Sequence, residues 1–270
     1  MSRSWMRAGS TIAAVTAMLL VAQGAYASTP LADGAIVDTN AVTASYTFTT
    51  TSHYWSVVGV ATSADYDLSL YDVGGALLGT SDYGTGVTDF IAINSNLRPL
   101  GWYSATVTHY SGIGSYYVQQ NQGHTVTTLP VPDNDGVTGP SDPDLAFATV
   151  DSQNVISVSD IYLTAGQQFW VNVADTGQYF FMLESNPADP STFIRTRAQA
   201  TAITGTRTAE GCTLYTANYT GWHGLVEVNT DLPHATSPQR GTANALDGYD
   251  PARPNTCPQR NFPAATPAGP

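Results

Sequence analysis

The segment Ala64-Asp65-Tyr66-Asp67-Leu68-Ser69-Leu70-Tyr71-Asp72 alternates polar and apolar residues along its length. Successive side chains of a β-strand point to opposite faces, so this pattern is typical of a strand with one face in a core and the other in solvent. Similar short segments recur at intervals of about 8 to 12 residues, separated by turns rich in Gly, Asn and Asp. The first group comprises 46–48, 54–58, 66–70, 90–93, 103–107 and 116–118, and the second 156–158, 161–163, 169–173, 179–183, 214–217 and 225–228.

These segments predict an all-β fold of two tandem antiparallel β-sandwiches, jelly-roll-like, with almost no helix. The boundary falls in an acidic segment that carries Pro130, Pro132, Pro140 and Pro143, because proline cannot continue a central strand. We expect a first domain over 28–128, a linker over 129–144, a second domain over 145–232 and a Pro-rich tail over 233–270.

The two groups can be aligned with each other. Placing Tyr46 on Ile161 also places Trp55 on Trp170, and a second alignment places the turn Tyr110-Ser-Gly112 on Tyr219-Thr-Gly221. We therefore predict an internal duplication in which Trp55 and Trp170 occupy equivalent core positions.

The first 27 residues have the three parts of a secretory signal. Arg3 and Arg7 precede an apolar run from Ile12 to Ala22, and Ala25-Tyr-Ala27 follows as the cleavage site. The run is shorter than the roughly 18 to 20 residues of a spanning helix. We expect a protein without a membrane span that is secreted or held at the cell surface.

The chain of 270 residues is acidic, with nine Arg, no Lys and a formal charge of −12, which becomes −14 once Arg3 and Arg7 are removed. Phosphate contacts need clustered basic residues, and only Arg195 and Arg197 lie close together, so nucleic acid is excluded as a partner.

Cys212 and Cys257 are the two cysteines. An oxidising compartment favours one bridge over two free thiols, so we predict a disulfide that ties the tail to the second domain.

The first group, over about 43–120, resembles the bacterial pre-peptidase C-terminal domain, a small β-sandwich found beside many secreted peptidases. The features that carry this resemblance are Tyr46-Thr-Phe48 before Tyr54-Trp55, the segment 64–72, and Trp102-Tyr103 followed by Gly114-Ser-Tyr116. In the second group Gln178–Glu184 replaces the Asp-rich segment, so that group is a divergent copy. The family has no fixed activity, and some of its members are thought to bind matrix polymers or cell-surface material.

Calcium is the one cofactor that the sequence suggests, because calcium prefers several oxygen ligands. The candidate ligands lie around the linker, with a solvated acidic linker as the competing interpretation. They are Asp133, Asp135, Asp142 and Asp144. A second candidate group is Asp65, Asp67 and Asp72, of which the first two share a strand face.

No catalytic signature is present. The five His residues, His53, His109, His124, His223 and His234, are scattered, and neither Gly-x-Ser-x-Gly nor His-Glu-x-x-His occurs. We therefore expect a protein that is not an enzyme.

Aromatic residues in turns are the candidate ligand-binding groups, with caps at the ends of the sandwich as the alternative. Tyr83, Tyr219 and Trp222 are the residues selected, together with His53-Tyr54 before a strand. The sequence thus predicts a secreted, non-catalytic protein that binds an extracellular polysaccharide or a matrix or surface protein. A self-assembling subunit of a surface layer or appendage and a small secreted hydrolase remain as alternatives.

Overall fold

The computed structural model describes residues 29–36, 43–125, 144–146, 156–173, 178–203, 212–229 and 243–246. These residues form β-strands with two short 3₁₀ helices, η1 (Pro190–Thr192) and η2 (Arg197–Gln199). The predicted all-β, antiparallel fold class is confirmed. In this part of the chain no helix is long and apolar enough to cross a membrane.

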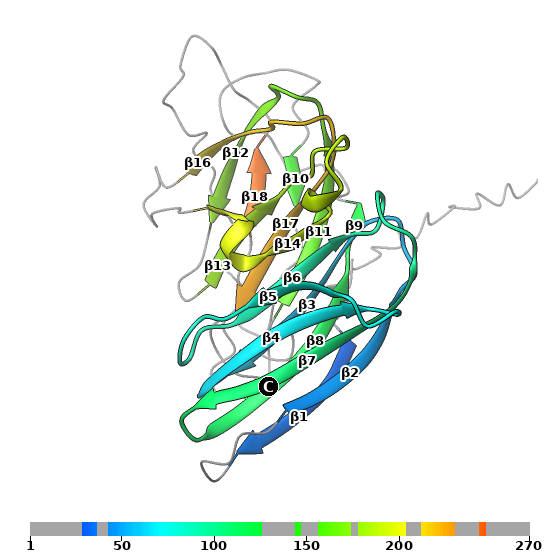
Figure 1. Ribbon diagram of the computed structural model, residues 1–270. Coiled ribbons are helices and arrows are strands. Elements are labelled where there is room, and N and C mark those ends of the chain that lie inside the picture. The colour runs from blue at the N-terminus through cyan, green and yellow to red at the C-terminus, as the bar shows by residue number, and fades with distance from the viewer. Residues whose placement is uncertain are drawn as a thin grey trace, which may run out of the picture.

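The strands form four sheets, which we number I to IV in the order in which they stack (Figure 1). Sheet I contains β2 (Thr43–Thr50), β7 (Gly101–Ser111), β4 (Asp65–Asp72) and β5 (Leu77–Ser81), in that order. Sheet II contains β1 (Thr29–Ile36), β8 (Gly114–Gln122), β3 (Trp55–Thr62), β6 (Asp89–Asn94) and β14 (Ile194–Thr196). Sheet III contains β15 (Thr201–Ile203), β13 (Gln178–Leu183), β17 (Gly221–Asn229), β11 (Ile156–Leu163) and β9 (His124–Thr125). Sheet IV contains β10 (Asp144–Ala146), β18 (Ala243–Leu246), β12 (Gln168–Val173) and β16 (Cys212–Thr216).

Three apolar cores lie between successive layers. The core between sheets I and II includes Phe48, Leu68 and Val107. The core of sheet III that faces sheet IV includes Phe180, and Tyr215 of β16 packs there. A third core joins sheets II and III, where the rings of Phe90 and Phe181 meet edge to face with centroids 5.1 Å apart. The two halves of the chain therefore pack face to face.

The central strand β3 is buried along its whole length because both of its faces are covered. Val58 and Val60 point into the core with sheet I, whereas Trp55, Val57 and Ala61 point into the core with sheet III. Trp55 is thus a buried residue as predicted, but it lies between the two halves and not inside the first sandwich. The predicted equivalent, Trp170, lies in β12, and its side chain is outside the described part of the structure.

The halves also exchange strands. The short strand β14, from the second half, pairs with β6 and completes sheet II, while β9, from the first half, pairs in parallel with β11 in sheet III. Sheet IV includes β18, which pairs with β12, so the second set of strands continues past the predicted boundary at 232 into the predicted tail. The linker from 129 to 143 lies outside the described residues.

The strand order of the first half recurs in the second. Sheet I, in the order β2-β7-β4-β5, corresponds to β11-β17-β13-β15 of sheet III, and β1-β8-β3-β6 of sheet II corresponds to β10-β18-β12-β16 of sheet IV. Trp55 and Trp170 therefore lie in corresponding strands, as the duplication hypothesis predicts. The alignment of the two turns was wrong. Tyr110 and Ser111 are the last residues of β7 and Gly112 lies in the β7–β8 turn, whereas Tyr219 and Thr220 precede β17, the counterpart of β7, and Gly221 is its first residue.

Candidate functional site: a surface aromatic cluster

Three aromatic side chains from both halves of the chain meet at the surface and form what we call the aromatic cluster: Tyr54, Tyr162 and Trp222. The ring centroid of Trp222 lies 5.3 Å from that of Tyr54 and 5.5 Å from that of Tyr162, and both contacts are edge to face. Tyr162 is 54% exposed, and the other two rings are half-buried. Such geometry is favourable for aromatic pairs and leaves ring surface in contact with solvent.

Hydrogen bonds between the halves fix the base of this cluster. The indole Nε1 of the buried Trp55 donates to the carbonyl oxygen of Trp222 over 2.9 Å, and the backbone N–H of Trp55 donates to Oδ1 of Asp160 over 2.8 Å. Gly123 N–H donates to the carbonyl of Trp55 over 2.7 Å. The aromatic cluster is therefore held by buried polar contacts that join sheets II and III.

Asp160 is a fully buried carboxyl beneath the cluster. Burial raises its pKa well above the usual value, against the opposing effect of the hydrogen bond from Trp55 N–H. Its second oxygen, Oδ2, has no hydrogen-bond partner. A charge without a second partner in such a place is costly, so the neutral acid is the favoured form in the folded protein.

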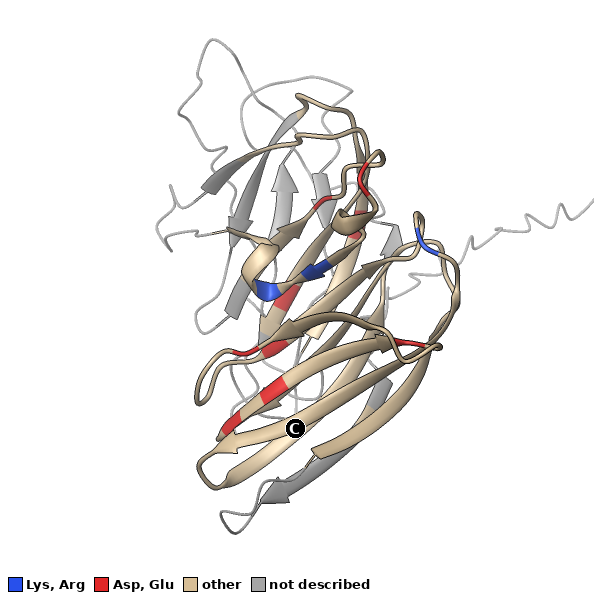
Figure 2. Cartoon of the chain, viewed as in Figure 1, with Lys and Arg blue, Asp and Glu red and all other residues tan. Residues whose placement is uncertain are grey.

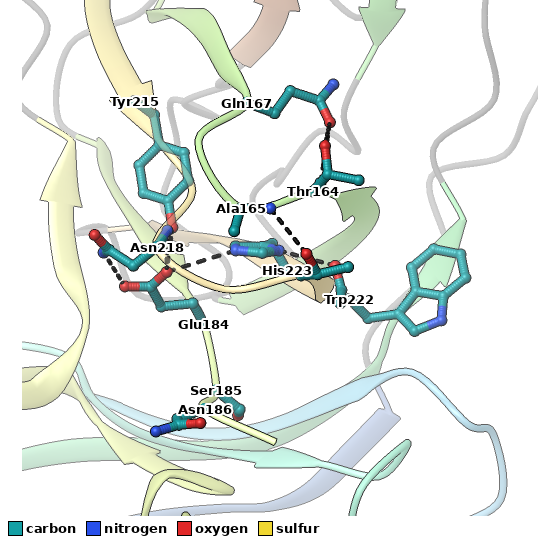
Figure 3. A network of polar contacts seen from close by, with 12 residues as sticks. Thr164, Ala165, Gln167, Glu184, Ser185, Asn186, Tyr215, Asn218, Trp222 and His223 are labelled. Carbon is teal, nitrogen blue, oxygen red and sulfur yellow. Dashed lines mark hydrogen bonds and ion pairs between the residues drawn. The ribbon is translucent and has the colours of Figure 1, made fainter. Parts of the chain in front are cut away.

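On the opposite face of β17, His223 points toward Glu184 while Trp222 points away from it (Figure 3). The Nε2 atom of His223 lies 3.6 Å from Oε2 of Glu184, which also accepts hydrogen bonds from Asn218 N–H at 3.0 Å and from Tyr215 Oη at 3.3 Å. Burial alone raises the pKa of Glu184, but the interactions with His223 and Asn218 outweigh it and lower the pKa to about 2. Burial and the charge of Glu184 raise the pKa of Tyr215.

This network stabilises the structure by joining Glu184 to Tyr215, Asn218 and His223. Nδ1 of His223 lies 3.0 Å from the carbonyl oxygen of Gly221, which can only accept, so Nδ1 carries a proton and donates to it. A nucleophilic triad needs a Ser or Thr hydroxyl or a Cys thiol beside the histidine, whereas among the described residues the polar contacts of this ring are to the Gly221 carbonyl and Glu184. Glu184, with its pKa near 2, serves as an acceptor that holds the turn before β17.

The structure separates the three aromatic residues predicted to bind ligand. Trp222 belongs to the aromatic cluster, together with Tyr54. Tyr83 is 37% exposed in the loop between β5 and β6, where the guanidinium of Arg197 lies 5.0 Å from its ring centroid. Tyr219 lies half-buried in the turn before β17. Sequence reasoning missed Tyr162 as a surface ring, although its place between Ile161 and Leu163 turns it away from the core.

The predicted calcium ligands Asp133, Asp135 and Asp142 lie outside the described residues, and Asp144 begins β10. Within the described ranges no three His, Cys, Asp or Glu residues are grouped so as to hold a metal. Asp65 and Asp67 share the outer face of β4, as expected, and burial and the charges of Asp65 and Asp82 raise the pKa of Asp67. Asp72 instead accepts from Ala76 N–H in the following turn.

Cys212 is the first residue of β16, and Cys257 lies outside the described residues, so the disulfide stays a prediction. Of the histidines, His53 is exposed, and His109 is buried with Nε2 2.7 Å from the carbonyl of Gly112 in the β7–β8 turn. Gly112 has φ +85°, a conformation that favours glycine. His109 thus stabilises a hairpin.

Comparison with protein-family models finds no match, and comparison with curated proteins finds none. Among solved structures, the periplasmic g-type lysozyme inhibitor PliG of Aeromonas hydrophila aligns with 47% of this chain over 97% of its own, at 16% identity and a TM-score of 0.29. The PBSX exported protein XepA aligns with 81% of this chain over 85% of its own, at 8% identity and a TM-score of 0.26. An oxalate decarboxylase of Bacillus subtilis aligns with 77% of this chain over 70% of its own, at 12% identity and a TM-score of 0.17. Likeness at this level says nothing about the function of this chain.

Proposed function

We propose that this chain is a secreted, non-catalytic β-sandwich protein that binds an extracellular polymer or cell-surface material. The observation that supports the proposal is the aromatic cluster of Tyr54, Tyr162 and Trp222, which keeps ring surface exposed at a junction of buried polar contacts. Large apolar rings that remain in solvent mark an interaction surface, particularly when polar residues surround them.

Rigidity is the second support for binding. Tyr and Trp have few rotatable bonds, and here they are held by mutual ring contacts and by the bond from Trp55 to the Trp222 carbonyl. A ligand that docks on such a surface orders few side chains, so little conformational entropy opposes binding. A signal-like start and a resemblance of 43–120 to pre-peptidase C-terminal domains fit the same proposal.

The experiment is cosedimentation of the mature protein with four insoluble materials, namely cellulose, chitin, peptidoglycan and fibrillar collagen. We expect saturable binding to at least one of them. The double variant Trp222→Ala with Tyr162→Ala should weaken that binding by at least about tenfold, equivalent to about 1.4 kcal/mol.

Ile113→Ala is the matched control, because Ile113 is 61% exposed in the β7–β8 turn, away from the cluster. It should bind as the wild type does, and the melting temperature of each variant reports whether it is folded. Absence of binding to all four materials, or equal binding by the folded double variant, would reject the proposal.

A further inference from the structure

The outer face of sheet I is an unusual sheet surface. Along β2 and β7 three consecutive cross-strand pairs on this face consist only of hydroxyl residues: Thr43 with Thr108, Ser45 with Thr106 and Thr47 with Ser104. The hydroxyls of Ser45 and Thr106 are 2.8 Å apart. Threonine is β-branched and stiff, so the pairs form a fixed array of donors and acceptors.

Two exposed rings bound this hydroxyl array. Trp102 is 60% exposed and Tyr110 is 74% exposed, and both lie on β7 with the same outward parity as Ser104, Thr106 and Thr108. The eight residue steps from Trp102 to Tyr110 span about 27 Å at about 3.4 Å per residue in an antiparallel strand. The face therefore offers a polar track along β7 with an aromatic ring at each end, and the pairing of β7 with β4 has a register shift beside Tyr110.

The equivalent face of sheet III is covered by sheet II, so the two faces can be compared position by position. Tyr162 pairs with Trp222 as Thr49 pairs with Trp102, so the two tryptophans occupy equivalent positions. Beyond them the pairs Val158 with Val226 and Ile156 with Val228 stand where sheet I has its Ser and Thr pairs, and they are buried against sheet II.

At several of these positions the two faces differ by hydroxyl groups on side chains of similar shape, such as Thr106 against Val226, while Asp160 and Gly224 stand where sheet I has Thr47 and Ser104. The apolar residues on the face of sheet III suit packing against another sheet, and they would equally suit a sheet of a second copy of the chain. The hydroxyl set is suited to a ligand that is itself rich in hydroxyls. Solubility alone is ordinarily provided by charged side chains, yet β2, β5 and β7 carry no Asp, Glu or Arg (Figure 2).

Charge narrows the class of ligand further. The charged residues on this face are Asp65 and Asp67 of β4, beside the Tyr110 end. The chain has no Lys at all, and its formal charge is −12. Anionic polymers would be repelled by this face, so a neutral polymer is the one with suitable electrostatics.

We propose that the outer face of sheet I binds a single extended chain of a neutral polysaccharide, which lies along β7 with sugar rings on Trp102 and Tyr110. Hydroxyls of the polymer exchange hydrogen bonds with the Ser and Thr pairs between the two rings. This inference rests on the proposed function and names its ligand class. Four residues of chain separate Thr49, opposite Trp102, from Tyr54, so the Trp102 end of the track leads toward the aromatic cluster.

The test is titration calorimetry of the mature protein with cello- and chito-oligosaccharides of two to eight residues, with oligogalacturonates as anionic probes. Affinity for one neutral series should rise with length until the oligosaccharide reaches both rings, and then level off. Oligogalacturonates should bind at least tenfold more weakly. Trp102→Ala and Tyr110→Ala should each weaken binding of the longest neutral probe by at least tenfold. Thr106→Val introduces the residue found at the equivalent position of sheet III, and it should weaken binding severalfold.

Leu77→Ala, on the edge strand β5 with 56% of Leu77 exposed, is the control and should bind normally. Melting temperatures establish that each variant is folded. If Trp102→Ala and Tyr110→Ala leave the affinity for oligosaccharides unchanged, the track is wrong, whereas cosedimentation that depends on Trp222 would still uphold the proposed function. No binding of any neutral oligosaccharide, stronger binding of oligogalacturonates, or cosedimentation with collagen alone would each overturn this inference.

Discussion

At the scale of single residues, Asp89 gives a clear dependence of stability on pH. It is buried at the start of β6, where it accepts from Ser81 Oγ at 2.5 Å and from Tyr83 N–H at 3.2 Å. Burial raises its pKa to about 6, in spite of these bonds and of Arg197. The unfolded chain releases this proton near pH 3.8 and the folded protein near pH 6, so the stabilising contribution is complete below the lower value and is lost as pH rises through the higher one.

We predict that this loss amounts to about 2 kcal/mol between pH 4 and pH 7. Asp89→Asn keeps an acceptor for Ser81 and Tyr83 but cannot ionise. Urea unfolding at several pH values should show that the wild type loses stability relative to this variant as the pH rises. Parallel curves for the two proteins would contradict the assignment.

The contribution of Glu184 to stability should follow the opposite trend, with a loss as the pH falls. Its pKa of about 2 in the folded protein lies below the ordinary value of 4.5, so its contribution is present above pH 4.5 and is lost as the pH falls toward 2. Glu184→Gln should therefore be less stable than the wild type at pH 6, and the difference should shrink on acidification. Chemical unfolding at pH 6, 4 and 3 measures it, and a difference that stays constant would show that the Glu184 charge does not hold the turn.

At the scale of elements, the contact between the β8–β9 connection and β11 depends on one glycine. A Cβ on Gly123 would lie 1.7 Å from Asp160 Oδ2 and 2.7 Å from the carbonyl oxygen of Trp55. We predict that Gly123→Ala lowers the free energy of unfolding by about 3 kcal/mol or more, because the Trp55 carbonyl belongs to the backbone of a buried strand and Asp160 is fully buried.

Gly84→Ala is the matched control, since a Cβ there meets nothing within 4 Å. It should change stability by no more than about 0.5 kcal/mol. Thermal unfolding of both variants decides the matter, and a Gly123→Ala protein as stable as the control would show that Asp160 does not pack against this site as described.

The positions of the strands can be predicted from the sequence, whereas the packing of the sheets on one another cannot. Alternation placed β2, β4 and β7 correctly because each has one face in solvent. The uninterrupted apolar run in β3 indicates that both faces are covered, but the covering sheet comes from residues a hundred positions away, and periodicity carries no information about it. The strands β14 and β18, of three and four residues, are too short for any period to appear.

The candidate site shows the same limit. Trp222 and Tyr54 stand out as aromatic residues near turns, whereas Tyr162 has the pattern of an ordinary strand residue. What makes Tyr162 part of a surface cluster is that β11 extends past the edge of the contact with sheet II. That is a property of the packing between the halves, which depends on Phe90 and Phe181 and is not encoded near Tyr162.

At the scale of the whole molecule, the shared core between sheets II and III predicts one cooperative unfolding transition. Phe181→Ala removes half of the Phe90–Phe181 contact and should cost about 3 to 5 kcal/mol. Because β14 and β9 cross between the halves, we expect the variant to show a single transition shifted to lower temperature. Calorimetry measures this directly. Two separate transitions, with only one of them shifted, would mean that the halves fold independently.

The central claim is that the protein binds an extracellular polymer without altering it. The most direct measurement is a binding isotherm on the insoluble material that retains the protein, with the supernatant assayed over hours for released sugar or peptide. We predict saturable binding that Trp222→Ala with Tyr162→Ala weakens, and no soluble product at any time. Steady release of product that Glu184→Gln abolishes would contradict it, because the Glu184–His223 pair would then act in catalysis.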